Sequence, residues 1–154
     1  MIDPMLKEKG ADQLVGKIAI ASAKKAYQIY LEMISSDRFK KLEENGAQRQ
    51  RVLWASTGTK DPSFSDVLYV ETLIGKDTIN TLPMETIDAF RDHGKVAETL
   101  TQDISDSNNA MSELEKIGID IDKITQKLED EGIEKFNVAY EKLLKSIDDQ
   151  KRKF

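Results

Sequence analysis

The residues with the clearest capacity for chemistry form one short loop, Ser56-Thr57-Gly58-Thr59-Lys60, which directly follows an apolar run. A hydroxyl, the backbone amides freed by Gly58 and the Lys60 ammonium can each contact an anion. The spacing of glycine and lysine differs from that of a P-loop, and no helix follows directly. The segment therefore indicates a site for a phosphate-bearing ligand, and the alternative is a polar loop that binds nothing.

Two predicted strands carry this loop and its neighbour. Residues 52–56 form an uninterrupted apolar run, which is typical of a buried strand, and residues 78–82 form a second short β-prone run before Pro83. Strands that alternate with helices across short turns imply a parallel sheet with right-handed crossovers. Asn80 and Thr81 would then face the same rim as the first loop, although Thr81 alone also fits a helix cap.

Helices are predicted for most of the remaining chain. A long helix is expected from Asp12, as its cap, to Glu44, where Asn45-Gly46 supplies a stop. The further predicted helices cover residues 65–74 with Ser65 as cap, 84–92, 122–131 with Asp122 as cap, and 133–151. Another ends at Ile117, with several possible caps among residues 105–109, and breaks are expected at Gly118 and Gly132.

These elements predict an α/β fold that is helix-rich overall and part of a TIM (β/α)8 barrel. Two parallel strands cannot stand alone, because both would be sheet edges, and a barrel normally takes about 250 residues. The chain has 154. Residues 1–154 are expected to form a single segment, in which 12–94 are consecutive βα units and 95–154 are a helical extension of the same domain.

Other kinds of site fit the sequence poorly. A triad of Ser56, His93 and Asp92 is rejected, because His93 sits in the last turn of a helix before a glycine, where it suits a cap or dipole-compensating role. The acidic groups at 120–122 and 129–131 lack the glycine and glutamate that a calcium loop needs. With no cysteine in the chain, thiolate ligands and thiol nucleophiles are excluded. No metal and no cofactor are expected.

Composition narrows the classes of partner. Hydrophobic residues make up 39% and charged residues 33%, a balance typical of folded globular proteins. A formal charge of −5 argues against nucleic acid, and the basic cluster Lys151-Arg152-Lys153 reads as a solvated helix end. No apolar run approaches the ~20 residues of a membrane span, and the first residues do not resemble a signal peptide. The absence of cysteine suits a reducing compartment, so a cytoplasmic location is expected.

Several segments resemble the transaldolase family. Residues 54–60, which read W-A-S-T-G-T-K, and 65–75, S-D-V-L-Y-V-E-T-L-I-G, are similar to its seventh strand and following helix. Residues 78–94, T-I-N-T-L-P-M-E-T-I-D-A-F-R-D-H-G, are similar to its eighth strand and helix. The sixth helix and the C-terminal helices of the family resemble L-V-G-K-I-A-I-A-S-A-K-K-A-Y-Q (14–28) and G-I-D-I-D-K-I-T-Q-K-L-E-D-E-G-I-E-K-F (118–136). The resemblance covers nearly the whole chain, in order, and implies that its two strands are the last two of the barrel.

The resemblance also implies a reaction. Transaldolases transfer a dihydroxyacetone unit from sedoheptulose 7-phosphate to glyceraldehyde 3-phosphate, in the pentose phosphate pathway, through a lysine Schiff base. No segment here is similar to the family's T-S-N-P or K-I-P-A-T strands, so neither the Schiff-base lysine nor the acid-base carboxylates can be placed. Met1 stands where the family has a phosphate-binding arginine, just past the sixth strand. Ser56 and Lys60 are the expected phosphate ligands, with Thr57 and Gly58 as secondary loop contacts.

Three hypotheses follow. The first is a C-terminal transaldolase fragment that is inactive by itself and binds sugar phosphates. Such a fragment could come from a split gene, in which case a matching N-terminal fragment would be a second partner, or from a truncated gene. The second is a noncatalytic module that associates with itself or a partner through its strand edges. The third is a loop that still binds sugar phosphate weakly, with millimolar affinity at best because the arginine is missing.

Overall fold

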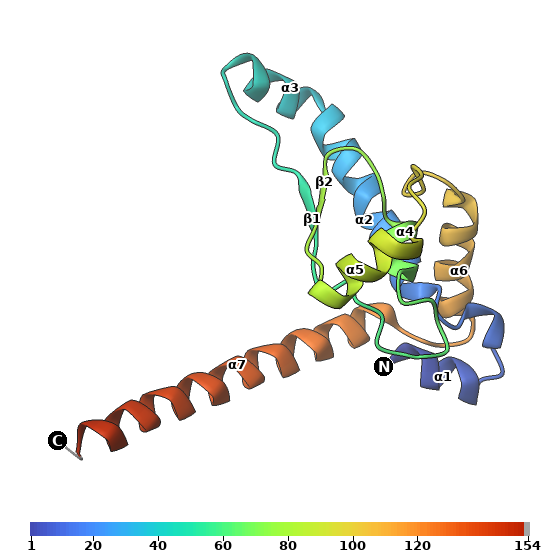
Figure 1. The fold of residues 1–154 in the computed structure, drawn as a ribbon. Helices are drawn as coiled ribbons and strands as arrows, with labels where there is room; N and C mark the ends of the chain where they lie inside the picture. Colours follow the sequence, from blue (N-terminus) through green and yellow to red (C-terminus); the bar gives the residue numbers. More distant parts are fainter. Residues whose placement is uncertain (153–154) are drawn as a thin grey trace.

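The computed structural model describes residues 1–152 and is helix-rich, with one small parallel sheet (Figure 1). Lys153, part of the basic cluster noted above, lies outside the described residues. The elements, in chain order, are α1 (Ile2–Glu8), η1 (Asp12–Leu14), α2 (Ile18–Ser35), α3 (Asp37–Glu44), β1 (Val52–Trp54), α4 (Leu68–Thr72), β2 (Thr78–Asn80), α5 (Met84–His93), α6 (Ile104–Lys116) and α7 (Ile121–Lys151).

The sheet consists of β1 and β2, paired in parallel with Leu53 opposite Ile79. The predicted parallel pair is therefore confirmed, although both strands are shorter than expected. β1 ends at Trp54 because Ser56 takes a left-handed conformation, with φ 58°. The pairing still reaches past the strand ends, since the Thr81 amide donates to the Trp54 carbonyl at 2.9 Å. The complete barrel stays a prediction.

The single helix predicted from Asp12 to Glu44 is wrong. Gly16 takes a φ of 76°, which a helix does not allow, so Asp12 starts only a 3-10 turn and α2 begins at Ile18. Ser36 then ends α2 in an extended conformation and caps α3, its hydroxyl accepting from the Phe39 amide at 3.3 Å. The chain therefore forms two helices with a turn between them.

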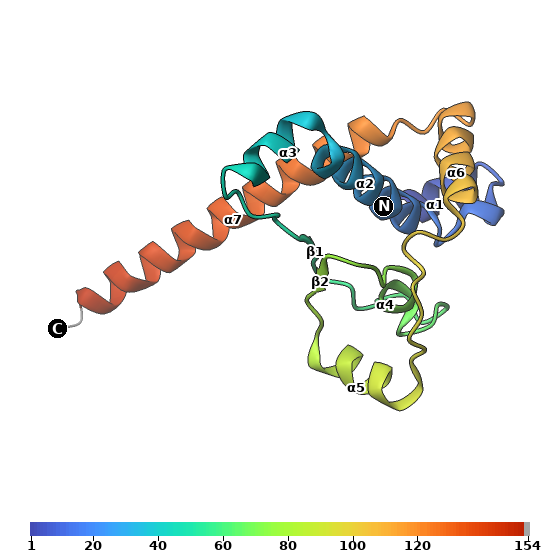
Figure 2. The same ribbon diagram turned by 90° about the horizontal axis from the view of Figure 1, so that it is seen from above.

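The main core lies between α1, η1, α2, α6 and the start of α7. Its most deeply buried members are aliphatic: Leu6, Ala11, Leu14, Ile18, Ala21, Leu114 and Ile119. A smaller cluster of Tyr27, Leu73 and Leu100 packs α2 against the sheet, with Val52 and Trp54 beside it. The two clusters explain the view in Figure 2, where α2 lies between α6 on one side and the sheet on the other.

The helix α7 is continuous over 31 residues, from Ile121 to Lys151. The predicted break at Gly132 is wrong, since a helical glycine costs only about 1 kcal/mol and does not bar the conformation. The cap is Asp120 and not Asp122, because the Asp120 carboxylate accepts from the Lys123 amide at 3.1 Å. Figure 1 shows the C-terminal half of α7 extending away from the other elements. In residues 1–152, no helix combines the length and apolar character that a bilayer span requires.

Candidate functional site

A cleft of ≈ 440 Å³ opens where β1 ends and brings together all four residues predicted to bind phosphate. Ser56, Thr57, Gly58 and Lys60 line it from the loop after β1. The opposite walls come from other elements: Asp3 of α1, Ala19 and Ala23 of α2, Phe64, Tyr69 and Leu73 around α4, and Trp54, Ala55 and Asp61 beside the loop. The small side chains of α2 leave room for the cavity.

Ser56 reaches the cleft through an unusual backbone conformation. Its φ of 58° lies in the left-handed region, which a residue with a Cβ enters at a cost of roughly 1–2 kcal/mol. The side chain is exposed. The chain is thereby turned sharply just after the strand, and Ser56 lines the cleft.

Thr57 differs from Ser56, because its side chain is buried and already engaged. It is 6% exposed, and its hydroxyl donates to the Oδ1 atom of Asn80 at 2.6 Å. The Thr81 hydroxyl in turn donates to the Trp54 carbonyl at 3.1 Å. Each of the two strand ends therefore donates a side-chain hydrogen bond to the other. Because the Thr57 hydroxyl already donates to Asn80, Thr57 can donate to a ligand only from its backbone amide.

Gly58 lies against the start of α5. A Cβ atom at this position would be 3.1 Å from Pro83 Cγ and 3.1 Å from Thr86 Oγ1. Thr86 is itself buried. The absence of a side chain therefore lets the loop pack closely on the first turn of α5.

The charges around the cleft are mixed. Lys60 contributes one exposed ammonium, while Asp3 and Asp61 contribute two carboxylates. The hydroxyl and the amide of Ser63 both donate to Asp61, at 2.7 and 2.9 Å, and lower the pKa of its carboxyl. Asp3 accepts from the Gly16 amide at 3.2 Å. One cation against two carboxylates gives no net attraction for an anion, so these residues alone predict a low affinity for phosphate.

Comparison with known proteins identifies the family of the chain. Residues 2–147 match the model of the family described as transaldolase/fructose-6-phosphate aldolase. The chain belongs to that family. It is 43% identical over 93% of its length to the transaldolase of Neisseria meningitidis serogroup A, and 45% identical over 87% to that of Thiobacillus denitrificans. The transaldolase of Mycolicibacterium smegmatis is 42% identical over 97% of the chain.

The transaldolases that match are much longer than this chain. It spans 41% of the N. meningitidis protein, 37% of the T. denitrificans protein and 41% of the M. smegmatis protein. It is thus equivalent to a fragment of these proteins. The family match extends through α5, α6 and most of α7, so the helices after the sheet belong to the transaldolase segment as much as the candidate site does.

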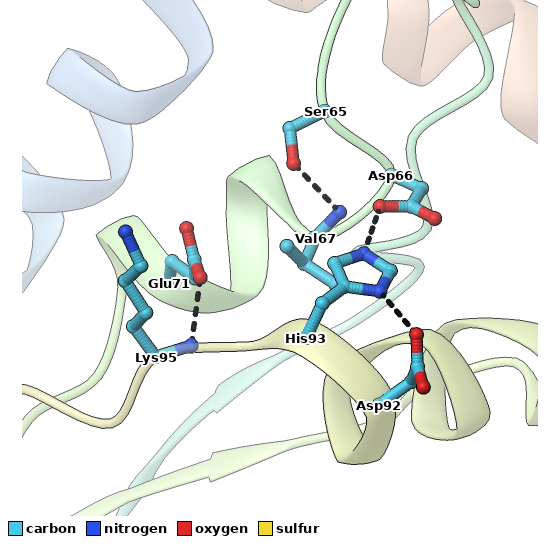
Figure 3. A network of polar contacts seen from close by, with 7 residues as sticks. All are labelled: Ser65, Asp66, Val67, Glu71, Asp92, His93 and Lys95. Carbon is cyan, nitrogen blue, oxygen red and sulfur yellow. Dashed lines mark hydrogen bonds and ion pairs between the residues drawn. The ribbon is translucent and has the colours of Figure 1, made fainter.

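In this transaldolase segment, His93 lies in a polar network outside the cleft (Figure 3). Its Nε2 atom is 2.9 Å from the Asp66 carboxylate and its Nδ1 atom is 3.2 Å from that of Asp92. Both acids raise the pKa of the imidazole, the hydrogen bond to Asp66 most of all. The neighbouring Lys95 amide donates to Glu71 at 2.8 Å. The network joins the end of α5 to the start of α4, through side chains and not through the helix carbonyls that a capping role would use.

Asp3 and Asp61 are the charged residues of the cleft lining that sequence reasoning missed. Asp3 belongs to α1, a helix that was not predicted, and Asp61 lies just past Lys60 in a turn. An acidic residue next to a candidate anion ligand is itself a sequence signal, and it indicates that the loop alone does not make a strong anion site.

Proposed function

We propose that this chain forms the phosphate-binding end of a transaldolase active site, in the last two βα units of a TIM barrel. The observation that carries the proposal is the cleft at the carboxyl end of β1, where Ser56, Gly58 and Lys60 converge. Barrel enzymes bind ligands at that end of their strands, and the loops after the last two strands often hold phosphate. Membership of the family supports sugar phosphates as the substrate class of the proposed site.

The reaction proposed for the complete site is transfer of a dihydroxyacetone unit from sedoheptulose 7-phosphate to glyceraldehyde 3-phosphate. In such a transfer a lysine amine condenses with the ketone, water leaves, and the iminium accepts the electron pair of the carbon–carbon bond that breaks. The role of this chain is to hold the phosphate at the other end of the sugar. Correct placement of a remote phosphate is itself catalytic, because it orients the reacting carbons.

The chain by itself is proposed to be inactive. A Schiff-base lysine must lie in the cleft and be desolvated enough to lose its proton. Lys60 lines the cleft but is exposed, and Lys24 is buried but donates from Nζ to the Gln102 carbonyl at 2.7 Å, outside the cleft lining. We accordingly propose that a matching N-terminal segment supplies the nucleophile, and that the pair acts in the cytoplasm.

Two assays test this function. Purified chain, incubated with both sugar phosphates, is expected to give no transfer product, and borohydride is expected to trap no ketose phosphate on it. Addition of the N-terminal part of the T. denitrificans transaldolase, the part that this chain does not match, is expected to restore transfer. Turnover or trapping by the chain alone would contradict the assignment of the nucleophile to the other segment.

The contribution of the cleft is tested in the same mixture. Lys60→Ala is expected to raise KM for sugar phosphates with a smaller change in kcat, because it removes a charged contact to the phosphate. Lys9→Ala is the matched control, since Lys9 is exposed and does not line the cleft. Equal kinetics for Lys60→Ala and Lys9→Ala would remove Lys60 from the site.

A second candidate function, weak phosphate binding by the isolated chain, is favoured by the convergence of Ser56 and Lys60 in one cleft. Titration with inorganic phosphate is expected to shift the amide resonances of residues 56–60 with a Kd of about 1 mM or weaker, equivalent to about −4 kcal/mol. The shifts should be lost in Lys60→Ala. Unchanged resonances in this loop at saturating phosphate would exclude the function.

A further inference from the structure

Tyr69 is a polar residue of the cleft lining that the proposed phosphate contact does not use. It belongs to α4, on the wall opposite the loop of Ser56 and Lys60. Its side chain is half-buried, and within residues 1–152 its hydroxyl forms no hydrogen bond. The buried side-chain atoms without a partner in those residues are Oη of Tyr30 and Oγ1 of Thr59, so the Tyr69 hydroxyl is accessible. An accessible, unpaired phenol in a cleft is a ready donor to a ligand.

Asp3 supplies a matching acceptor. Its Oδ1 atom accepts from the Gly16 amide at 3.2 Å, and its Oδ2 atom has no hydrogen-bond partner in the described residues. Burial raises the pKa of the Tyr69 phenol, and the negative charges of Asp3 and Asp61 raise it further. The phenol therefore keeps its proton and can donate it. The cleft thus presents an O–H donor and a carboxylate acceptor within electrostatic reach of each other.

The two residues stand where the cleft meets a second cavity. Asp3 and Tyr69 line both the cleft and a hollow of ≈ 350 Å³ between α1, α2 and the start of α7. The remaining walls of that hollow are mainly aliphatic and offer few partners to a hydroxyl-bearing ligand. The cleft instead adds the polar loop of Ser56 and Lys60. A polar ligand in reach of both Asp3 and Tyr69 is therefore expected on the cleft side.

Resting on the proposed phosphate site, we propose that Asp3 and Tyr69 determine specificity by binding a hydroxyl group of the sugar phosphate. A hydroxyl both donates and accepts, so one such group can donate to the Asp3 carboxylate and accept from the Tyr69 phenol. The phosphate lies on the loop side, at Lys60, and the adjoining carbons extend toward the opposite wall. The role also explains a carboxylate in a cleft for an anion, because a phosphate ligand without hydroxyls leaves Asp3 unsatisfied and is disfavoured.

The test compares two ligands that differ only in their hydroxyl groups, glycerol 3-phosphate and propyl phosphate. Each is titrated into the full chain, and the amide resonances of residues 56–60 report binding. The Kd for glycerol 3-phosphate is expected to be about fivefold lower than the Kd for propyl phosphate, which is the effect of one net hydrogen bond. Inorganic phosphate, titrated in parallel, reports the phosphate contact alone.

Two variants assign this difference to the pair. Tyr69→Phe removes only the hydroxyl and keeps the ring, so it should bring the ratio of the two Kd values to about one. Asp3→Asn keeps an oxygen that can accept from the Gly16 amide but loses the charge, so it should lower the ratio, because hydrogen bonds to charged groups are the stronger ones. Tyr140→Phe is the matched control and should leave the ratio unchanged, since Tyr140 is 61% exposed on α7 and does not line the cleft.

Equal Kd values for the two organic phosphates in the unmodified chain would overturn the proposal, and so would a difference that survives Tyr69→Phe. If inorganic phosphate still shifts residues 56–60 in either case, the phosphate site stands and only the role of Asp3 and Tyr69 fails. No shift with any of the three ligands would remove the phosphate site, and the specificity pair with it. The Tyr69 hydroxyl forms no hydrogen bond within residues 1–152, so Tyr69→Phe is expected to melt like the unmodified chain.

Discussion

The hydrogen bond from Thr57 to Asn80 is expected to be a main support of the candidate site, and replacing Thr57 with Val tests it. Valine keeps the shape of the side chain and removes only the hydroxyl. The bond is short, at 2.6 Å, and Thr57 is 6% exposed, so water cannot easily replace the lost donor. A typical hydrogen bond contributes about 1 kcal/mol, and a buried partner left unsatisfied costs about 1–3 kcal/mol.

The expected loss is therefore about 1–2 kcal/mol in the free energy of unfolding. For a chain of this size each kcal/mol corresponds to about 2–4 °C in Tm, so Thr57→Val should melt about 2–8 °C lower. Trp54 is the only tryptophan and its Nε1 atom donates to the Leu73 carbonyl at 3.2 Å beside the site. Its fluorescence during urea unfolding reports on the region that the substitution affects.

Two controls separate this hydrogen bond from general damage. Thr57→Ser keeps the hydroxyl and should recover most of the stability, and Thr81→Val, at an exposed position, should lose less than Thr57→Val. A double-mutant cycle of Thr57→Val with Asn80→Ala should give a coupling of about 0.5–1.5 kcal/mol. A coupling near zero, or equal stability of Thr57→Val and the unmodified chain, would refute the idea that this bond holds the two strand ends together.

Three further predictions concern the backbone and the histidine network. Gly16→Ala should unfold the chain at lower urea by about 1–3 kcal/mol, because Gly16 has a φ of 76° and a Cβ there would lie 2.9 Å from the Phe64 ring. Gly132→Ala should raise the ellipticity at 222 nm and stabilise α7 by up to about 1 kcal/mol; a loss of helix would instead favour a break at this position. His93 has a raised pKa when folded, so its ion pairs stabilise the chain fully below the ordinary pKa of 6.5, and this contribution is lost as pH rises through the folded pKa. The Tm difference between the unmodified chain and His93→Gln should thus be larger at pH 5.5 than at pH 8.5, and an equal difference at both would contradict the network.

The parts of the fold that sequence predicted best depend on local signals. The strands at Val52 and Thr78 were recognised from short apolar and β-branched runs between turns, and α5 from Pro83 at its start and Gly94 at its end. The helix predicted to end at Ile117, with its cap among residues 105–109, was found at Ile104–Lys116, so its end was predicted better than its start. In each case the residues that decide the structure lie within the element or next to it.

The errors arose where two local signals compete. The apolar spacing of a helix continues through Ser36, so periodicity alone predicts one helix from Asp12 to Glu44, but the Ser36 hydroxyl satisfies the free amide of Phe39 and starts a new one. The error at Gly132 is the reverse. The glycine predicts a break between two helices, but both flanking segments favour helix and α7 runs through it. A cap satisfies a hydrogen bond that the backbone leaves free, whereas a helical glycine only lowers a preference.

For the candidate site, sequence predicted the gathering of residues but not their individual roles. The carboxyl ends of parallel strands share one edge, so the loop after β1 was expected to lie near Asn80 and Thr81. Thr57 does lie there, but neither Asn80 nor Thr81 lines the cleft. The hydrogen bond between Thr57 and Asn80 joins residues 23 positions apart and depends on the register of the sheet. The presence of Asp3 in the cleft depends on the packing of α1, which no local pattern fixes. Roles that rest on long-range contacts therefore needed the structure.

The edges of the small sheet carry one of the exposed apolar regions of the described residues. Both strands are edges and Leu53 is 52% exposed, although parallel sheets are normally covered on both faces. This region should be covered by the N-terminal transaldolase segment, because an uncovered face of parallel strands needs a neighbouring layer. Leu53→Lys should therefore reduce the transfer that the added segment restores, because it puts an ammonium into that apolar contact. Undiminished restored transfer with Leu53→Lys would show that the segment does not cover this region.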